Sequence, residues 1–150
     1  QSNYGGRLLV CGKPYVSPDH KDKDGSIVII VATDAPLSSR NLKRVAARSF
    51  GGLARTGAAL SNGSGDYALA FSTDQRLRRT PARRKAVTDY PELSNDAISP
   101  LFEATIEATE EAILNSLCAA ETTTGFNAGT GKASTVEAIS IDTLKTLLSA

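Results

Sequence analysis

The sequence predicts an α/β fold in which amphipathic helices cover a sheet. Residues 26–33 and 67–73 are short apolar runs typical of buried strands. Residues 38–56 and 97–121 space their apolar residues like one face of a helix. Elements with one apolar face bury it by stacking in layers, so we expect a layered architecture. The segments before residue 26 supply too little strand for a complete sheet, and we expect the sheet to continue in a missing partner chain.

The first elements in chain order surround the longest apolar run. Residues 7–11 predict a short strand, and residues 12–24 predict an exposed loop because they are rich in glycine, proline and charge. Ile27 to Ala32 is the longest apolar run, and such a run is typical of a central strand covered on both faces. We therefore expect the strand at residues 26–33 to lie inside the protein.

The first helix has start and stop signals. Ser38 or Ser39 provides a capping hydroxyl, and Gly57 is a suitable stop. Gly51 and Gly52 weaken the helix locally but permit close packing against a neighbour. The Asn-Gly-Ser-Gly-Asp run at residues 62–66 predicts a tight loop before the second strand.

The second half of the chain begins with a polar stretch. Residues 74–94 predict a long surface excursion, and residues 97–121 predict the clearest helix. Residues 125–131 contain three glycines and predict a flexible loop. Asp142 is expected to cap a last helix at residues 143–149. The side chains expected inside that helix are Leu144, Leu147 and Leu148.

Composition excludes several classes of protein. The 150 residues include 17 basic and 16 acidic ones, which gives no reason to expect nucleic acid or an anionic membrane as partner. No apolar run approaches the roughly 20 residues of a membrane span, so we expect a soluble protein, with the cytoplasm favoured. A lone His20 and two distant cysteines, Cys11 and Cys118, make a zinc cluster or a Ser-His-Asp triad a poor interpretation. We expect no cofactor and two reduced, partly buried thiols.

The chain opens with Gln1-Ser2-Asn3-Tyr4, without an initiator methionine or a signal segment. We therefore expect it to be a fragment of a longer product.

The informative local feature is Gly25-Ser26 at the head of a hydrophobic strand. A serine hydroxyl is a poor nucleophile until a base removes its proton. The α-amino group of an N-terminal serine, with a pKa of about 7.7–8.0, can be that base. It must first be released from the preceding residue, and Gly25 favours this because glycine permits unusual backbone geometry. A loop that ends in an ordinary strand cap explains the same two residues.

The run from Gly25 to Leu37 closely resembles the processing site of the L-aminopeptidase/D-amino-acid esterase–amidase (DmpA) family. That family includes the β-peptidyl aminopeptidases and is related to the nylon-oligomer hydrolases. The resemblance touches nearly all of the chain. It extends through residues 1–5, 52–57, 64–66, 70–73, 101–104, 107–114 and 120–122.

The resemblance implies a precursor that cuts itself before the nucleophile. Residues 1–25 would be the tail of the α chain, and residues 26–150 the β chain with its N-terminal nucleophile. The implied fold is a four-layer αββα sandwich, of which this chain supplies the C-terminal part. The implied reaction removes N-terminal residues from small peptides, amides or esters through an acyl-enzyme. The implied partners are the missing α-chain region and further αβ pairs in a homo-oligomer.

The resemblance also assigns roles by position. Ser26 would be the nucleophile, and its freed amine the base. Ser64 matches a position that hydrogen-bonds near the nucleophile, and Asp66 an acidic position that orients that serine or the ammonium. Asn3 matches an asparagine that donates to the oxyanion. Without the resemblance, Ser64, Asp66 and Asn3 are ordinary turn residues.

Other interpretations remain open or fail. A non-catalytic member of the family that never cleaves, or an acyltransferase on the same scaffold, fits the same residues. The glycine-rich stretch at residues 125–132 lacks the spacing of a phosphate-binding loop. The basic run at residues 76–85 has no interleaved aromatic residues, so a solvated loop or a subunit contact explains it better than nucleic acid does.

Overall fold

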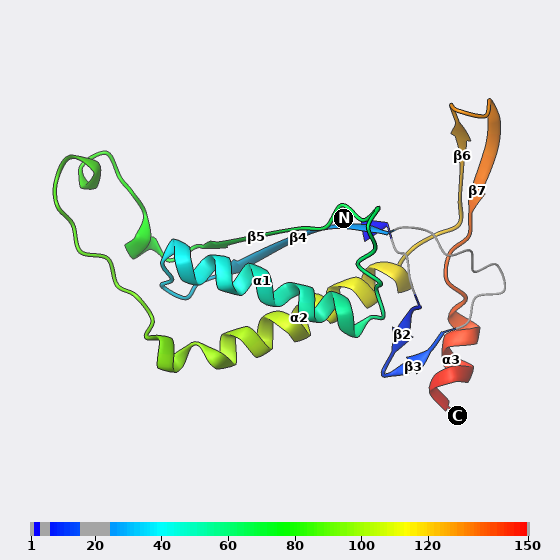
Figure 1. Ribbon diagram of the computed structural model, residues 1–150, viewed down its shortest axis with the longest axis horizontal. Coiled ribbons are helices and arrows are strands. Elements are labelled where there is room, and N and C mark those ends of the chain that lie inside the picture. Colours follow the sequence, from blue (N-terminus) through cyan, green and yellow to red (C-terminus); the bar gives the residue numbers. More distant parts are fainter. Residues whose placement is uncertain (1, 4–6, 16–24, 150) are drawn as a thin grey trace.

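The computed structural model of the protein describes residues 2–3, 7–15 and 25–149. Figure 1 shows the order and arrangement of its helices and strands. The main elements are β1 (Ser2–Asn3), β2 (Leu9–Val10), β3 (Lys13–Pro14), β4 (Ser26–Thr33), α1 (Ser39–Arg55), β5 (Tyr67–Ser72), α2 (Ser99–Cys118), β6 (Thr123–Asn127), β7 (Lys132–Val136) and α3 (Ile141–Ser149).

The central sheet has the order β1-β4-β5. β4 and β5 are parallel, with pairs that run from Val28 opposite Tyr67 to Thr33 opposite Ser72. β1 is antiparallel to β4 and pairs with its first two residues. The 26–33 strand is confirmed, and the second strand ends one residue earlier than the sequence predicts.

One face of β4 packs on the helices. Ile27 and Ile29 form a core cluster with Leu53 of α1 and Ile113 of α2. Side chains on a strand alternate between the two faces of a sheet, so Val28 and Ile30 point the other way. They are 48% and 63% exposed, and the expectation of a strand covered on both faces is therefore wrong for the described part of this chain. The reason is that the chain supplies one helix layer, on one side of the strand pair.

The two helices α1 and α2 approach each other closely at Gly52. A Cβ atom at this position would lie 2.4 Å from the Ile106 carbonyl oxygen and 2.7 Å from Thr109 Cβ. This confirms the close packing expected of the glycine pair. The ends of α1 are confirmed as well, because the Ser38 hydroxyl accepts a hydrogen bond from the Asn41 amide and Gly57 has φ of +84°.

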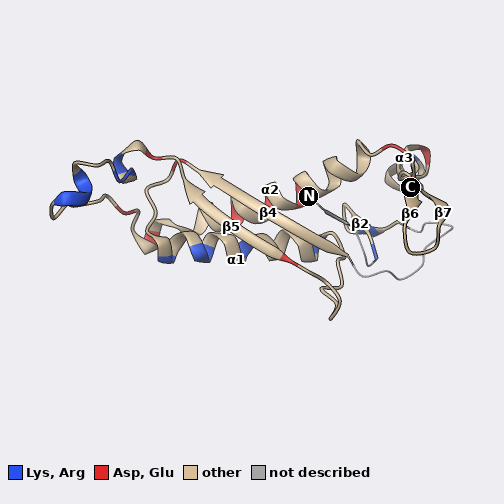
Figure 2. Ribbon diagram, turned by 90° about the horizontal axis from the view of Figure 1, so that it is seen from above, with Lys and Arg blue, Asp and Glu red and all other residues tan. Residues whose placement is uncertain are grey.

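The excursion at residues 74–94 lies on the surface, as predicted, and contains two short 3-10 turns, Gln75–Leu77 and Arg83–Lys85. It extends beyond the ends of the sheet strands at one end of the molecule (Figure 1). The ribbon of this segment carries the blue of Lys and Arg at that end of Figure 2.

The other end differs most from the sequence-based expectation. Residues 125–131 are part of a β-hairpin, β6–β7, and not of a flexible loop. Strand-favouring threonines flank the turn, and Thr124 and Thr135 hydrogen-bond across the ladder at 3.0 Å. Of the strand predicted at residues 7–11, only Leu9–Val10 is strand, paired with β3.

The last helix is confirmed, with two corrections. The Ser140 hydroxyl, and not the Asp142 side chain, accepts the hydrogen bond from the Thr143 amide. Leu144 is buried, Leu147 is partly buried, and Leu148 is exposed. The prediction that Leu148 lies inside is therefore wrong. The buried cluster of Leu8, Val10 and Leu144 contacts the helix on the side of Leu144.

Composition led to two expectations, one about the state of the cysteines and one about membrane-spanning segments. Cys11 and Cys118 are free thiols, as expected, but both are exposed instead of partly buried. In the part of the chain that the structure describes, no helix is long and apolar enough to cross a membrane.

Candidate functional site

Ser26 is the first residue of β4, and its side chain is exposed. The next residue, Ile27, is buried against the helices and fixes the start of the strand. Because side chains alternate along a strand, Ser26 shares a face with Val28 and Ile30, away from α1 and α2. The hydroxyl therefore opens onto the uncovered face of the sheet.

The parallel register of the sheet brings the tight loop at residues 62–66 to this hydroxyl. Tyr67 lies opposite Val28, so the residues before Tyr67 flank the start of β4. The Gly65 backbone N–H donates a hydrogen bond of 3.2 Å to Ser26 Oγ. Ser26 and Gly65, which are 39 positions apart in the sequence, thus meet at one end of the strand pair.

Ser64 and Asp66 are joined to each other on either side of Gly65. The Ser64 hydroxyl donates a hydrogen bond to Asp66 Oδ2, and both side chains are partly buried. The Ser64 amide also donates to the Ser61 carbonyl at 3.0 Å, which fixes the turn. Since the Ser64 proton points to the carboxylate, the lone pairs of its oxygen remain able to accept a hydrogen bond from a neighbouring group.

Asn3 is brought to the same place by its backbone. In the antiparallel pairing of β1 with β4, Asn3 lies directly opposite Ser26. The side chain of Asn3 is outside the described residues, so its expected role as an oxyanion donor stays a prediction. The sequence-based set of Ser26, Ser64, Asp66 and Asn3 thus converges at the backbone level.

Gly65 is the member of the site that sequence reasoning missed. An added Cβ atom at this position would lie 3.6 Å from Ser26 Oγ, in ordinary contact distance. A glycine here leaves that side of the hydroxyl open while its N–H holds the oxygen. The signal was a glycine between two polar residues, which also fits an ordinary turn.

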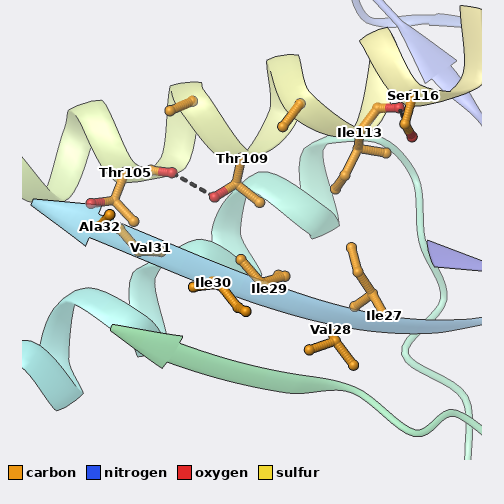
Figure 3. A pocket seen from close by; sticks show the side chains of 12 residues that line it. Ile27, Val28, Ile29, Ile30, Val31, Ala32, Thr105, Thr109, Ile113 and Ser116 are labelled. Atoms are coloured by element: carbon orange, nitrogen blue, oxygen red, sulfur yellow. Dashed lines mark hydrogen bonds between the residues drawn. The ribbon is translucent and has the colours of Figure 1, made fainter. Parts of the chain in front are cut away.

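A cavity of about 710 Å³ lies along β4 and is lined by residues of β4 and α2. Figure 3 shows Ile27 and Ile29 pointing toward Thr109 and Ile113 of α2 across it. The hydroxyls that line it bond to their own helix, as Thr109 does to the Thr105 carbonyl at 2.7 Å. Most of the lining is apolar, and the hydroxyls of Thr105, Thr109 and Ser116 are already hydrogen-bonded to carbonyls of α2. The described residues contain no cluster of three or more potential metal ligands.

Comparison with known proteins shows which family the chain resembles. Residues 1–132 match the sequence profile of Peptidase family S58. The β-peptidyl aminopeptidase BapA of Sphingosinicella microcystinivorans is 47% identical over 105 residues, which cover 69% of this chain and 26% of that protein. The chain spans about a quarter of the length of the curated relatives it matches.

Two solved structures have the same fold over nearly the whole chain. The PH0078 protein from Pyrococcus horikoshii OT3 is 37% identical with a TM-score of 0.76, and the match covers 95% of this chain and 38% of that one. The L-aminopeptidase D-Ala-esterase/amidase from Ochrobactrum anthropi, described as a new variant of the Ntn hydrolase fold, is 27% identical. Its TM-score is also 0.76, and the match covers 96% of this chain and 39% of that one. The fold class expected from the sequence is confirmed, and the chain belongs to Peptidase family S58.

Proposed function

We propose that this chain carries the nucleophile of a self-processing aminopeptidase that uses Ser26. The observation that supports it most is the exposed Ser26 hydroxyl at the head of β4, held by the Gly65 N–H at 3.2 Å. A nucleophile needs a fixed oxygen, an open approach and a nearby base. The first two are properties of this site, and a freed α-amino group on the same residue would be the third.

Processing is proposed to begin with the intact Gly25–Ser26 peptide bond. Ser26 Oγ attacks the Gly25 carbonyl carbon, the bond from that carbon to the Ser26 nitrogen breaks, and an ester forms. Water then hydrolyses the ester, which leaves a carboxylate on Gly25 and a free α-amine on Ser26. Gly25 would become the last residue of one chain, and Ser26 the first residue of the second.

Turnover would use the released amine. An ordinary α-amino group has a pKa of about 7.7–8.0, so part of it is neutral near pH 7, and in that form it accepts the hydroxyl proton as Oγ attacks the substrate carbonyl. The proton passes to the departing amine of the shortened substrate, and the acyl group stays on Oγ. Water attacks the acyl-enzyme, releases the amino acid and restores the hydroxyl. The proposed substrates are small peptides, amides or esters with a free N-terminus.

The neighbouring groups have separate proposed roles. The Ser64–Asp66 pair would orient the Ser26 amine, because a hydroxyl held by a carboxylate presents its oxygen lone pairs to an ammonium. Asn3 would donate to the oxyanion, a contribution of about 3 kcal/mol to transition-state stabilisation in enzymes that use such a donor. The rest of the substrate pocket would come from the α-chain region of the same precursor, and αβ pairs would assemble into a homo-oligomer.

The test is the intact mass and N-terminal sequence of the complete protein, beside Ser26→Ala and the control Ser39→Ala. Ser39 is an exposed serine of α1, so its loss is expected to leave processing unchanged. We expect the native protein and the control to show a new N-terminus at Ser26, and Ser26→Ala to stay whole. A folded native protein that stays whole would contradict the mechanism and favour a non-catalytic member of the family.

Activity is measured with amino-acid p-nitroanilides, which release a coloured amine when the acyl-enzyme forms. Added methylamine separates the hydrolase from an acyltransferase. A hydrolase yields mainly the free amino acid, whereas an acyltransferase yields mainly the methylamide. The second result would replace hydrolysis by acyl transfer and leave the role of Ser26 intact.

A further inference from the structure

Residues 74–90 form a basic arm whose shape is set by one arginine. The Arg83 guanidinium donates hydrogen bonds to the carbonyls of Arg76 and Arg78, and to that of Asp89 at 3.3 Å. The same guanidinium stacks on the Tyr90 ring, 4.5 Å from its centroid. These contacts join the outgoing and returning limbs of the arm. The backbone of the arm therefore has a defined form.

Most of the positive charge on the arm has no carboxylate partner. Arg76 pairs with Asp74 at 2.6 Å, and this hydrogen bond holds the pKa of the Asp74 carboxyl below its usual range. Asp74 thus stays ionised at neutral pH and neutralises Arg76. Among the described residues, no ion pair reaches the exposed cations Arg78, Arg79, Arg84 and Lys85. The tip of the arm is a compact basic surface.

The complementary surface lies on α2. Glu103, Glu107 and Glu111 are exposed and follow at intervals of four residues, so they share one face of the helix, which we call the acidic face. Like charges at this spacing destabilise a helix, and α2 contains no lysine or arginine to offset them. Within the described residues, the ion pair of α2 joins Glu110 to Arg55 at 3.4 Å, beside this face and not on it.

We propose that the basic arm of one copy of this protein binds the acidic face of α2 on a second copy. The chain is nearly neutral, at +1, yet it carries both a basic arm and an acidic helix face. The arm extends away from the helices of its own chain (Figures 1 and 2), so its tip is directed outward to a partner. Two copies related by a twofold axis would make the contact twice and close the assembly.

The chemistry of the contact sets its properties. Exposed ion pairs are individually weak, so the affinity depends on several of them acting together and falls with added salt. The buried inner face of α2, where Thr105, Thr109 and Ile113 pack, is untouched by this contact. The proposal rests on the homo-oligomer named under the proposed function and specifies one of its contacts. It does not depend on the proposed reaction at Ser26. Ser26→Ala protein is expected to assemble normally.

The experiment measures the mass of the complete protein by sedimentation velocity at 50 mM and 500 mM sodium chloride. Two variants reverse the charges on either side: Arg78→Glu with Lys85→Glu on the arm, and Glu107→Lys with Glu111→Lys on α2. In the described part of the chain, these four side chains make no hydrogen bond that the reversals would break. Each variant alone is expected to weaken assembly about tenfold or more at low salt, and an equimolar mixture of the two is expected to restore it.

The control is Arg40→Glu with Lys43→Glu, which changes the net charge equally on the exposed side of α1. It is expected to leave assembly unchanged. A monomeric native protein at 50 mM salt overturns the proposal, as does an assembly that neither reversal affects. If the arm variant dissociates the assembly but the mixture does not restore it, the arm binds another surface, such as the remainder of the precursor, and the acidic face is excluded.

Discussion

Replacing Gly52 by alanine tests the contact that holds α1 against α2 beneath the candidate site. The new Cβ atom would lie 2.4 Å from the Ile106 carbonyl oxygen, 2.7 Å from Thr109 Cβ and 3.0 Å from the Glu110 nitrogen. Optimal contacts between carbon atoms are about 3.5–4.0 Å, and two of these neighbours are backbone atoms that no rotamer change can move. The helices would have to separate by a large part of an ångström.

Gly51→Ala is the matched control, because it makes the same chemical change one residue earlier in the same helix. Its Cβ atom would meet the end of the Ile106 side chain at 3.3 Å, and a flexible side chain can move. Both variants gain helix propensity of about 1 kcal/mol, which cancels in the comparison. The difference between them isolates the clash, and overpacking of this kind costs about 1–3 kcal/mol.

The assay is urea unfolding of the complete protein, followed by far-ultraviolet circular dichroism. We expect the free energy of unfolding of Gly52→Ala to be lower than that of Gly51→Ala by this 1–3 kcal/mol, with Gly51→Ala equal to or above the native value. Equal stability of the two variants would mean that the helices do not approach as closely as the structure has them, and would refute the reasoning.

Three further predictions concern the site, the sheet face and the arm. Ser64→Ala and Asp66→Asn are each expected to lower kcat for a p-nitroanilide by about 10²-fold. Circular dichroism is expected to show that both variants stay folded. An unchanged kcat would remove both residues from the site. Ile30→Lys, on the uncovered face of β4, is expected to reduce the yield of folded complete protein. A four-layer fold stacks a second sheet on that face, and the new charge would be buried there. A normal yield and a normal melting temperature would contradict this. Arg83→Ala is expected to speed tryptic cleavage within residues 74–90 without lowering the melting temperature, whereas Arg78→Ala is expected to leave the rate of cleavage at the other sites unchanged.

Local physics explains which elements could be predicted from the sequence. The strand at residues 26–33 and the helix α1 have strong local signals, namely an apolar run, a capping Ser38 and the stop at Gly57. The hairpin β6–β7 was missed because its glycines predict flexibility, whereas its stability comes from pairs across the ladder such as Thr124 with Thr135. Such pairs cannot be predicted from the sequence of either strand alone.

The exposure of Val28 and Ile30 has a different cause. An apolar run predicts burial on both faces, but which face is covered depends on what the rest of the chain supplies. Here α1 and α2 cover the face of Ile27 and Ile29. The sequence-based pattern was correct about a strand and wrong about its environment within this chain.

For the candidate site, too, some features follow from the sequence and others from the tertiary structure alone. The sequence by itself determined the strand that carries Ser26 and, through its resemblance to a known family, predicted which residues would accompany it in the site. Only the tertiary structure decided that the Gly65 N–H donates to Ser26 Oγ and that Ser26 opens onto the sheet face away from the helices. The physical reason is the parallel register of β4 and β5, which sets Tyr67 opposite Val28 and so brings two distant loop ends together. Register depends on pairing between strands and on the helix that connects them, and neither is a property of a local run of residues.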